Sequence, residues 1–192
     1  MIAIVKYNAG NIASVQNALT RLGFESVVTD NVDELRSSEK VIFPGVGEAS
    51  SAMKYLKDRN LDEVIRSLKQ PVLGICLGQQ LMCAFSEEGN INCLGIFKTM
   101  VKKFPPTDLV PQMGWNSLSK LSGQLFQGIV ESDDVYFVHS YYAERCDNTV
   151  ATCNYILPFS AALQKDNFYA TQFHPEKSGS VGEQILMNFL KL

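Results

Sequence analysis

A cysteine near the middle of the chain lies in the setting of a nucleophile. Gly74-Ile75-Cys76-Leu77-Gly78 follows the pattern G-x-C-x-G, the nucleophile-elbow spacing with cysteine in place of serine. A sharp turn from strand to helix would expose the Cys76 side chain, and the flanking glycines would let strand and helix approach closely. The amino end of the helix favours a thiolate and offers N–H groups to an oxyanion. The pattern favours nucleophilic chemistry, although alone it also fits a small buried cysteine in a tight turn.

Such a nucleophile needs a base, and the chain has 2 histidines, His139 and His174. Pro175 biases His174 towards an extended backbone, in which the side chains of His174 and Glu176 project to the same side. A carboxylate there holds one ring nitrogen, fixes the tautomer and stabilises the imidazolium. His139 has no carboxylate at such a spacing. We therefore favour His174 as the base over His139, while either could instead be bonded to backbone groups within a sheet.

A second glycine turn, Pro44-Gly45-Val46-Gly47, follows another predicted strand. Its glycines permit positive φ angles and close approach of backbone N–H groups to a ligand. It is a candidate for the second half of an oxyanion hole. Read in isolation, the motif favours a plain turn between a strand and a helix.

The elements that would position these groups alternate between strands and helices. Strands are predicted at 2–7, 24–29, 40–45 and 71–75. Apolar residues at helical spacing predict helices after residue 11, over 61–68 and over 77–85. This order predicts an α/β fold, with an open, mostly parallel twisted sheet flanked by helices. The carboxyl ends of parallel strands share one edge, so the 44–47 turn should lie beside Cys76.

The second half of the chain differs from the first. From residue 94 to about 169, short strand-like pieces alternate with Pro, Gly, Asp and Asn clusters, which predicts hairpins and edge strands. A late return to the main sheet is predicted at 168–174, before a final helix over 181–190. With no repeat or linker, we expect residues 1–192 to form a single domain.

Composition narrows the function classes. The net charge of −3 argues against nucleic acid or an anionic membrane as the main partner. No apolar run approaches the roughly 18 residues of a membrane helix, and the first residues do not form a signal peptide, so we expect a cytoplasmic protein. The 5 cysteines include no C-x-x-C pair. With so few histidines, we expect no metal site and no cofactor.

Taken together, PGVG, GICLGQQ and FHPEKS resemble the class I, or triad, glutamine amidotransferases, in the same order along the chain. Four further stretches resemble one branch of that family, the glutaminase subunits of imidazole glycerol phosphate synthase in histidine biosynthesis. They are YNAGNIASVQNAL at 7–19, SEEG at 86–89, PQMGWN at 111–116, and the Lys-Ser after His-Pro-Glu. The resemblance runs over the whole chain. One departure is Gln79, where relatives commonly carry Met.

The resemblance implies a glutaminase in which Cys76 is the nucleophile, His174 the acid-base and Glu176 its orienting group. Glutamine would be hydrolysed to glutamate and ammonia through a thioester. Further positions carried over are oxyanion contacts at Gly45, Val46, Gly47 and Leu77; glutamine contacts at Gln80, Ser140 and Tyr141; and partner contacts at Asn11, Met113, Trp115, Asn116 and Lys177.

The partner implied is a (β/α)8-barrel cyclase subunit in a heterodimer, which receives the ammonia. In this family the oxyanion strand is thought to rest in an unproductive orientation until the partner binds its nucleotide substrate. Alternatives stay open: an amidotransferase subunit for surface sugars, anthranilate, pyridoxal phosphate or purines; a thiol esterase or peptidase; or an inactive scaffold subunit.

Overall fold

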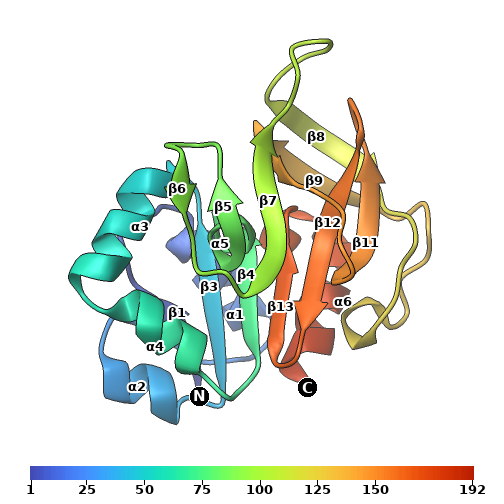
Figure 1. Cartoon of the computed structure of the whole chain (residues 1–192). Coiled ribbons are helices and arrows are strands. Elements are labelled where there is room, and N and C mark those ends of the chain that lie inside the picture. The colour runs from blue at the N-terminus through green and yellow to red at the C-terminus, as the bar shows by residue number, and fades with distance from the viewer.

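The structure, a computed structural model, describes residues 1–192 and is built around a seven-stranded sheet of order β11-β12-β13-β4-β3-β1-β2 (Figure 1). Five neighbouring strands are parallel: β13 (Phe168–Thr171), β4 (Val72–Cys76), β3 (Lys40–Gly45), β1 (Ile2–Val5) and β2 (Ser26–Thr29). At one edge β12 (Pro158–Lys165) and β11 (Thr149–Asn154) continue the sheet antiparallel.

Helices cover both faces of this sheet because its strands alternate their side chains between two apolar clusters. In β1, Ala3 and Val5 join one cluster, and Ile2 and Ile4 join the other. The first cluster also includes residues of α2 (Val32–Ser37), α3 (Ala49–Asp58), α4 (Leu61–Ser67) and α5 (Leu77–Met82). The second includes residues of α1 (Ile12–Arg21) and α6 (Gly179–Leu190). None of these helices has the length and apolar character needed to cross a membrane.

Two smaller sheets come from the middle of the chain. One has the order β10-β7-β5-β6, from Tyr141–Ala143, Phe97–Lys103, Cys83–Ser86 and Ile91–Asn92. The other pairs β8 (Gln112–Ser117) with β9 (Asp134–His139). Short 3₁₀ turns lie at η1 (Gln124–Phe126) and η2 (Pro175–Lys177). In Figure 1 the β8–β9 hairpin lies at the end of the molecule opposite both termini.

The predicted parallel sheet and the late return of 168–171 beside β4 are confirmed. The helix predicted over 77–85 was too long: α5 ends at Met82, because residues 83–86 pair with β6 and β7 as a strand. Among the strand-like pieces of the second half, residues 136–143 divide at Ser140 into β9 and β10, which belong to different sheets. Helices α2 and α3 were not predicted.

Candidate active site

The elbow around Cys76 is a strained turn between β4 and α5. Cys76 ends the fully buried β4 with φ 55° and ψ −105°, a conformation that a side-chain-bearing residue rarely adopts. A Cβ atom at position 78 would lie 1.8 Å from the backbone oxygen of Phe43, and one at position 74 would lie 3.0 Å from the backbone of Gly78. The predicted close approach of strand and helix is therefore confirmed at Gly78, while the contact at Gly74 is tight.

Cys76 is 6% exposed, and its sulfur has two polar neighbours. The Val138 carbonyl lies 3.9 Å from Sγ and accepts from the thiol. On another side, the Gln172 side-chain amide donates to Sγ at 3.6 Å. The sulfur thus lies at the carboxyl end of β4, where groups from β9 and from the segment after β13 contact it.

Beyond β13 the chain brings Glu176 onto His174. The Nδ1–H of His174 donates to Oε1 of Glu176 at 2.7 Å, and the His174 ring is fully buried. Since a carboxylate only accepts, this contact assigns the proton to Nδ1 and leaves Nε2 free. The expected extended backbone is found only at His174, because Pro175–Lys177 forms the 3₁₀ turn η2. Glu176 therefore reaches the ring through a tight turn.

Strand β9 fixes the backbone of this turn. The N–H of His174 donates to the Tyr136 carbonyl at 2.9 Å. The Ser178 hydroxyl donates to the His174 carbonyl at 2.6 Å and accepts from the Tyr136 N–H at 2.9 Å. The imidazole is thus anchored on both sides before any ligand binds.

Charge at the site determines the protonation of His174. Burial acts to lower the pKa of His174, but the nearby Cys76 side chain and the hydrogen-bonded Glu176 carboxylate together raise that pKa to about 10. No hydrogen bond joins Nε2 to a partner in the resting structure, and this nitrogen is buried. Catalytic hydrogen bonds are often loose before substrate binds. The arrangement places a histidine that favours its protonated form close to the cysteine.

His139 lies in a different environment. Its Nδ1 lies 2.7 Å from the Tyr141 carbonyl, and its Nε2 lies 2.9 Å from the Gln112 side-chain amide. Burial lowers the pKa of His139 to about 4, although the bond to Tyr141 opposes the shift. No carboxylate contacts it. A neutral ring donates from Nδ1 to the Tyr141 carbonyl and accepts at Nε2 from the Gln112 amide nitrogen, which requires the Gln112 amide to be turned from its placed orientation, in which Oε1 faces Nε2. We interpret His139 as a structural histidine.

Asn11 was predicted as a partner contact, but the structure places its side chain beside His174 and Glu176. It has a left-handed backbone (φ 75°) at the start of α1, and its side chain does not cap that helix. Its amide instead donates to Oε1 of Glu176 at 2.5 Å and lies 3.3 Å from Nδ1 of His174. Asn11 therefore holds the carboxylate that orients the ring.

The predicted oxyanion residues gather near Cys76. Gly45 pairs with Cys76 in the β3–β4 register, and Val46, Gly47 and Leu77 line the cleft beside it. The Val46 carbonyl accepts from the Gly10 N–H at 3.3 Å. Because a trans peptide is planar, the Gly47 N–H points to the side opposite Gly10. Gly47 has φ 130°, which strongly favours glycine.

The cleft at Cys76 has a volume of about 230 Å³, which suits a small molecule. The predicted glutamine contacts Gln80, Ser140 and Tyr141 line it together with Glu88. Glu88 was not predicted, although the SEEG stretch contains it. Burial raises the pKa of Glu88, nearby Glu48 adds to the rise, and a hydrogen bond from the Ala49 N–H acts against it. The Glu88 carboxylate accepts that bond at 2.8 Å and so is held in place.

Two of the predicted partner contacts on β8 share an exposed face. Met113 and Trp115 are 67% and 57% exposed, and the Trp115 ring packs edge-on against Tyr136. The Asn116 side chain donates to the Asn154 carbonyl at 3.0 Å, while Lys177 is exposed beside the triad turn. Neighbouring large apolar side chains exposed on one strand are candidates for an interaction surface.

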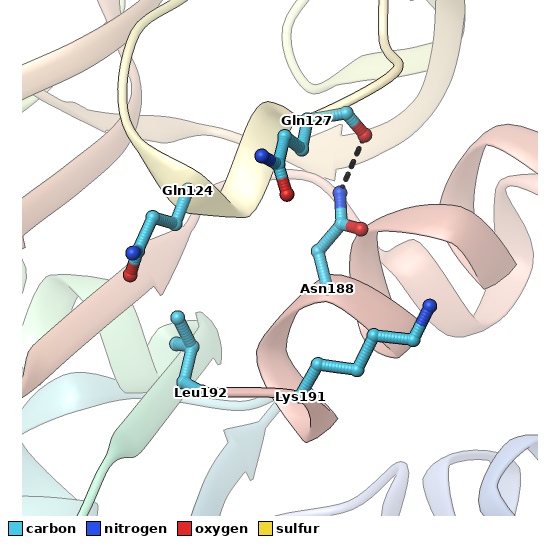
Figure 2. Close-up of a pocket in the computed structure, with 5 residues that line it drawn as sticks. All are labelled: Gln124, Gln127, Asn188, Lys191 and Leu192. Carbon is cyan, nitrogen blue, oxygen red and sulfur yellow. Dashed lines mark hydrogen bonds between the residues drawn. The ribbon is translucent and has the colours of Figure 1, made fainter.

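A second hollow, of about 170 Å³, lies between η1 and α6 (Figure 2). There the Asn188 side chain donates to the carbonyls of Leu125 and Gln127, which ties the final helix to η1. The lining side chains are mostly polar and include none from the Cys76 cleft. This hollow is a structural junction outside the candidate active site.

The comparisons with known proteins agree with this geometry. The family described as Glutamine amidotransferase class-I matches residues 3–192, and the chain belongs to it. Among solved structures, a glutamine amidotransferase from Thermotoga maritima aligns with a TM-score of 0.67 at 17% identity, covering 99% of this chain and 82% of that one. At this identity the likeness concerns the fold alone.

Curated relatives are much closer in sequence. The imidazole glycerol phosphate synthase subunit HisH of Bacteroides fragilis is 60% identical, covering 100% of this chain and 99% of that protein. The protein of the same name from Pasteurella multocida is 47% identical, covering 99% of this chain and 97% of the relative. The predicted family and fold class are therefore confirmed, and the enzyme is a glutamine amidotransferase.

Proposed function

We propose that this chain is the glutaminase subunit of an imidazole glycerol phosphate synthase, acting through Cys76, His174 and Glu176. The observation that carries the proposal is the strained Cys76 turn in a small cleft, with the buried His174–Glu176 pair bonded at 2.7 Å and electrostatically linked to the cysteine. The 60% identity to proteins of that name supports the choice of pathway.

The reaction follows from the protonation states. The Cys76 thiolate attacks the side-chain amide carbon of glutamine, and the carbon–nitrogen bond breaks as the His174 imidazolium gives its proton to the leaving ammonia. A glutamyl thioester stays on Cys76. Water then attacks the thioester while His174 takes its proton, and glutamate leaves as the thiolate is restored. Glu176 keeps Nδ1 protonated, so that Nε2 carries out both transfers.

The cleft offers complementary groups for the rest of glutamine. Both N–H groups of the Gln80 amide are already used, by the Tyr141 carbonyl at 2.9 Å and by Oε1 of Gln172 at 3.0 Å. Its oxygen is left to accept from the substrate ammonium, beside the Glu88 carboxylate. The N–H groups of Leu77 and Gly47 would stabilise the oxyanion. A missing donor of this kind reduces turnover about 10²- to 10³-fold.

The exposed β8 face fits a docking role. Met113 and Trp115 supply apolar area, and Lys177 supplies charge close to the triad turn. We assign to this face a (β/α)8-barrel cyclase, which would use the ammonia before it becomes ammonium in bulk water. The heterodimer would act in the cytoplasm, where its free cysteines stay reduced. Residues 1–192 would form one glutaminase domain.

The test is glutamate release by the purified chain, alone and with the cyclase and its nucleotide ligand. We expect slow release alone and an increase of at least about 10²-fold in the complete complex, because one oxyanion donor would be completed by the partner. Brisk release by the isolated chain would contradict the coupling. If only a sugar-modifying partner accelerates glutamate release, the subunit belongs to the sugar-modifying pathway. Turnover of esters or peptides would favour a thiol hydrolase.

A further inference from the structure

We propose that Gln172 is a positioning residue for the nucleophile, as the last member of a buried amide relay that runs from the Tyr141 carbonyl through Gln80 to the Cys76 sulfur. This inference rests on the proposed role of Cys76. The relay consists of three contacts: Gln80 to Tyr141 at 2.9 Å, Gln80 to Gln172 at 3.0 Å, and Gln172 to Sγ of Cys76 at 3.6 Å.

The direction of the relay follows from its first member. A backbone carbonyl can only accept, so Gln80 must turn its amide nitrogen towards Tyr141. The same nitrogen faces Gln172, which must therefore present its oxygen to Gln80. The Gln172 nitrogen is left to face the sulfur, and a donor is fixed on Cys76.

The position of Gln172 is fixed by its surroundings. Its side chain is fully buried, and its backbone N–H donates to the Ala161 carbonyl at 2.8 Å. It lies two residues before His174, so one short segment beyond β13 presents both the amide and the imidazole to the cysteine. Unlike His174, a neutral amide stays a donor at every pH.

Two consequences follow for the chemistry. Hydrogen bonds to charged groups are stronger than those between neutral groups, so an N–H aimed at sulfur stabilises the thiolate and fixes its direction of attack. In addition, Gln80 lines the substrate cleft, so the geometry of substrate binding and that of the nucleophile share one set of contacts. Loss of Gln80 should therefore disturb Cys76 although the two side chains are joined only through Gln172.

The test measures alkylation of Cys76 by iodoacetamide as a function of pH, with the modified cysteine located by mass spectrometry. Gln172→Met removes the donor at similar length and should slow alkylation at neutral pH about tenfold, the effect of roughly 1.4 kcal/mol. Gln80→Met should slow it about threefold through the broken relay. Gln79→Met is the matched control: Gln79 is equally buried and donates to the Ser160 carbonyl at 3.0 Å, so its loss should leave the profile unchanged.

A folded Gln172→Met protein whose alkylation profile overlays that of the wild type would overturn the proposal. Should that variant fail to fold, the wild type still decides by NMR: alkylation of Cys76 should shift the side-chain N–H signals of Gln172 but not those of Gln79, and an unmoved Gln172 signal would refute the contact. Labelling by a glutamine-analogue electrophile distinguishes failure of the proposed function from failure of the relay. If wild-type Cys76 is not labelled, its proposed role as nucleophile is refuted. If it is labelled but Gln172→Met has no effect on alkylation, only the relay is refuted.

Discussion

The surroundings of the two buried histidines give the same side chain opposite protonation states. His174 stands between the Cys76 side chain and the Glu176 carboxylate, and its pKa is raised to about 10. His139 stands among Phe104, Phe137 and Phe159, with ring centroids 5.3, 5.6 and 5.2 Å away, and its pKa is lowered to about 4. Burial disfavours the charged ring in both places, so the difference comes from the neighbouring charges.

The comparison shows why His174, whose backbone bonds to β9, suits a base and His139, within β9, does not. His139 ends β9, while Tyr136 of the same strand bonds the backbone of His174. The strand therefore supports the ring of the proposed base with its backbone and places the His139 ring in the core. Position near the sheet edge does not decide the role, because only His174 has a carboxylate bonded to its ring, that of Glu176 at Nδ1.

Replacement of each histidine gives the largest expected contrast. In the complex with the cyclase, His174→Ala should lower glutamine-dependent synthesis by about 10³-fold or more, because thiolate formation and both proton transfers lose their carrier. Ammonia-dependent synthesis by the cyclase should persist. His139→Gln should keep glutamine-dependent synthesis within about tenfold of the wild type. Similar losses in the two variants would refute the assignment.

Glu176→Gln tests whether charge, and not burial, separates the histidines. We expect a loss of about 10²- to 10³-fold in glutamine-dependent rate, because an amide can select the wrong tautomer of His174. The variant should also lower the pKa of His174. In the wild type the imidazolium is lost as pH rises through about 10, so the alkaline limb of the rate profile should move to lower pH in the variant. An alkaline limb at the same pH would contradict the charge argument.

The first half of the fold could be predicted because its apolar residues follow clear periods between glycine turns. The strands at 40–45 and 72–76 and the helix around Val15, Ala18 and Leu19 follow this pattern. Helices α2 and α3 were missed because the features that mark their starts are N-cap residues and not an apolar period. The Asn31 side chain accepts from the N–H groups of two residues of α2, and the Glu48 side chain does the same for α3. Glu48 directly follows the glycine turn at 44–47, and a glutamate is not among the residues preferred at an N-cap.

The candidate site also divides into residues that a local sequence pattern predicts and residues that it does not. The elbow and the His-Pro-Glu stretch have local spacing that identifies the chemistry. Asn11, Glu88 and Gln172 reach the site through contacts between segments far apart in sequence, up to 165 residues in the case of Asn11 and Glu176. No local pattern marks an amide as bonded to a distant sulfur or carboxylate. Such roles follow only from the folded arrangement.

The dependence of the free energy of unfolding on acid pH tests whether His139 is held neutral. The pKa of His139 is about 4 in the folded protein and near 6.5 when unfolded, so the unfolded state binds the proton more readily. The free energy of unfolding should therefore fall as pH drops from 6.5 towards 4, by roughly 3 kcal/mol from this group. Urea unfolding at pH 7 and pH 4.5 should show a smaller pH effect in His139→Gln than in the wild type. An identical pH effect would mean that His139 is not held neutral.

The smallest effect is expected from Asn11→Ala. Asn11 donates to Oε1 of Glu176 at 2.5 Å, so its loss should let the carboxylate and the attached His174 ring move without removing either. A hydrogen bond to a charged group contributes about 1.5–3 kcal/mol, of which part would appear as a roughly tenfold lower kcat with little change in KM. The matched control is Asn8→Ala on the same loop, since Asn8 donates to the Ser51 carbonyl at 3.3 Å and should leave kcat unchanged. Equal kcat values for the two variants in steady-state glutaminase assays of the complex would show that Asn11 does not set the position of the triad.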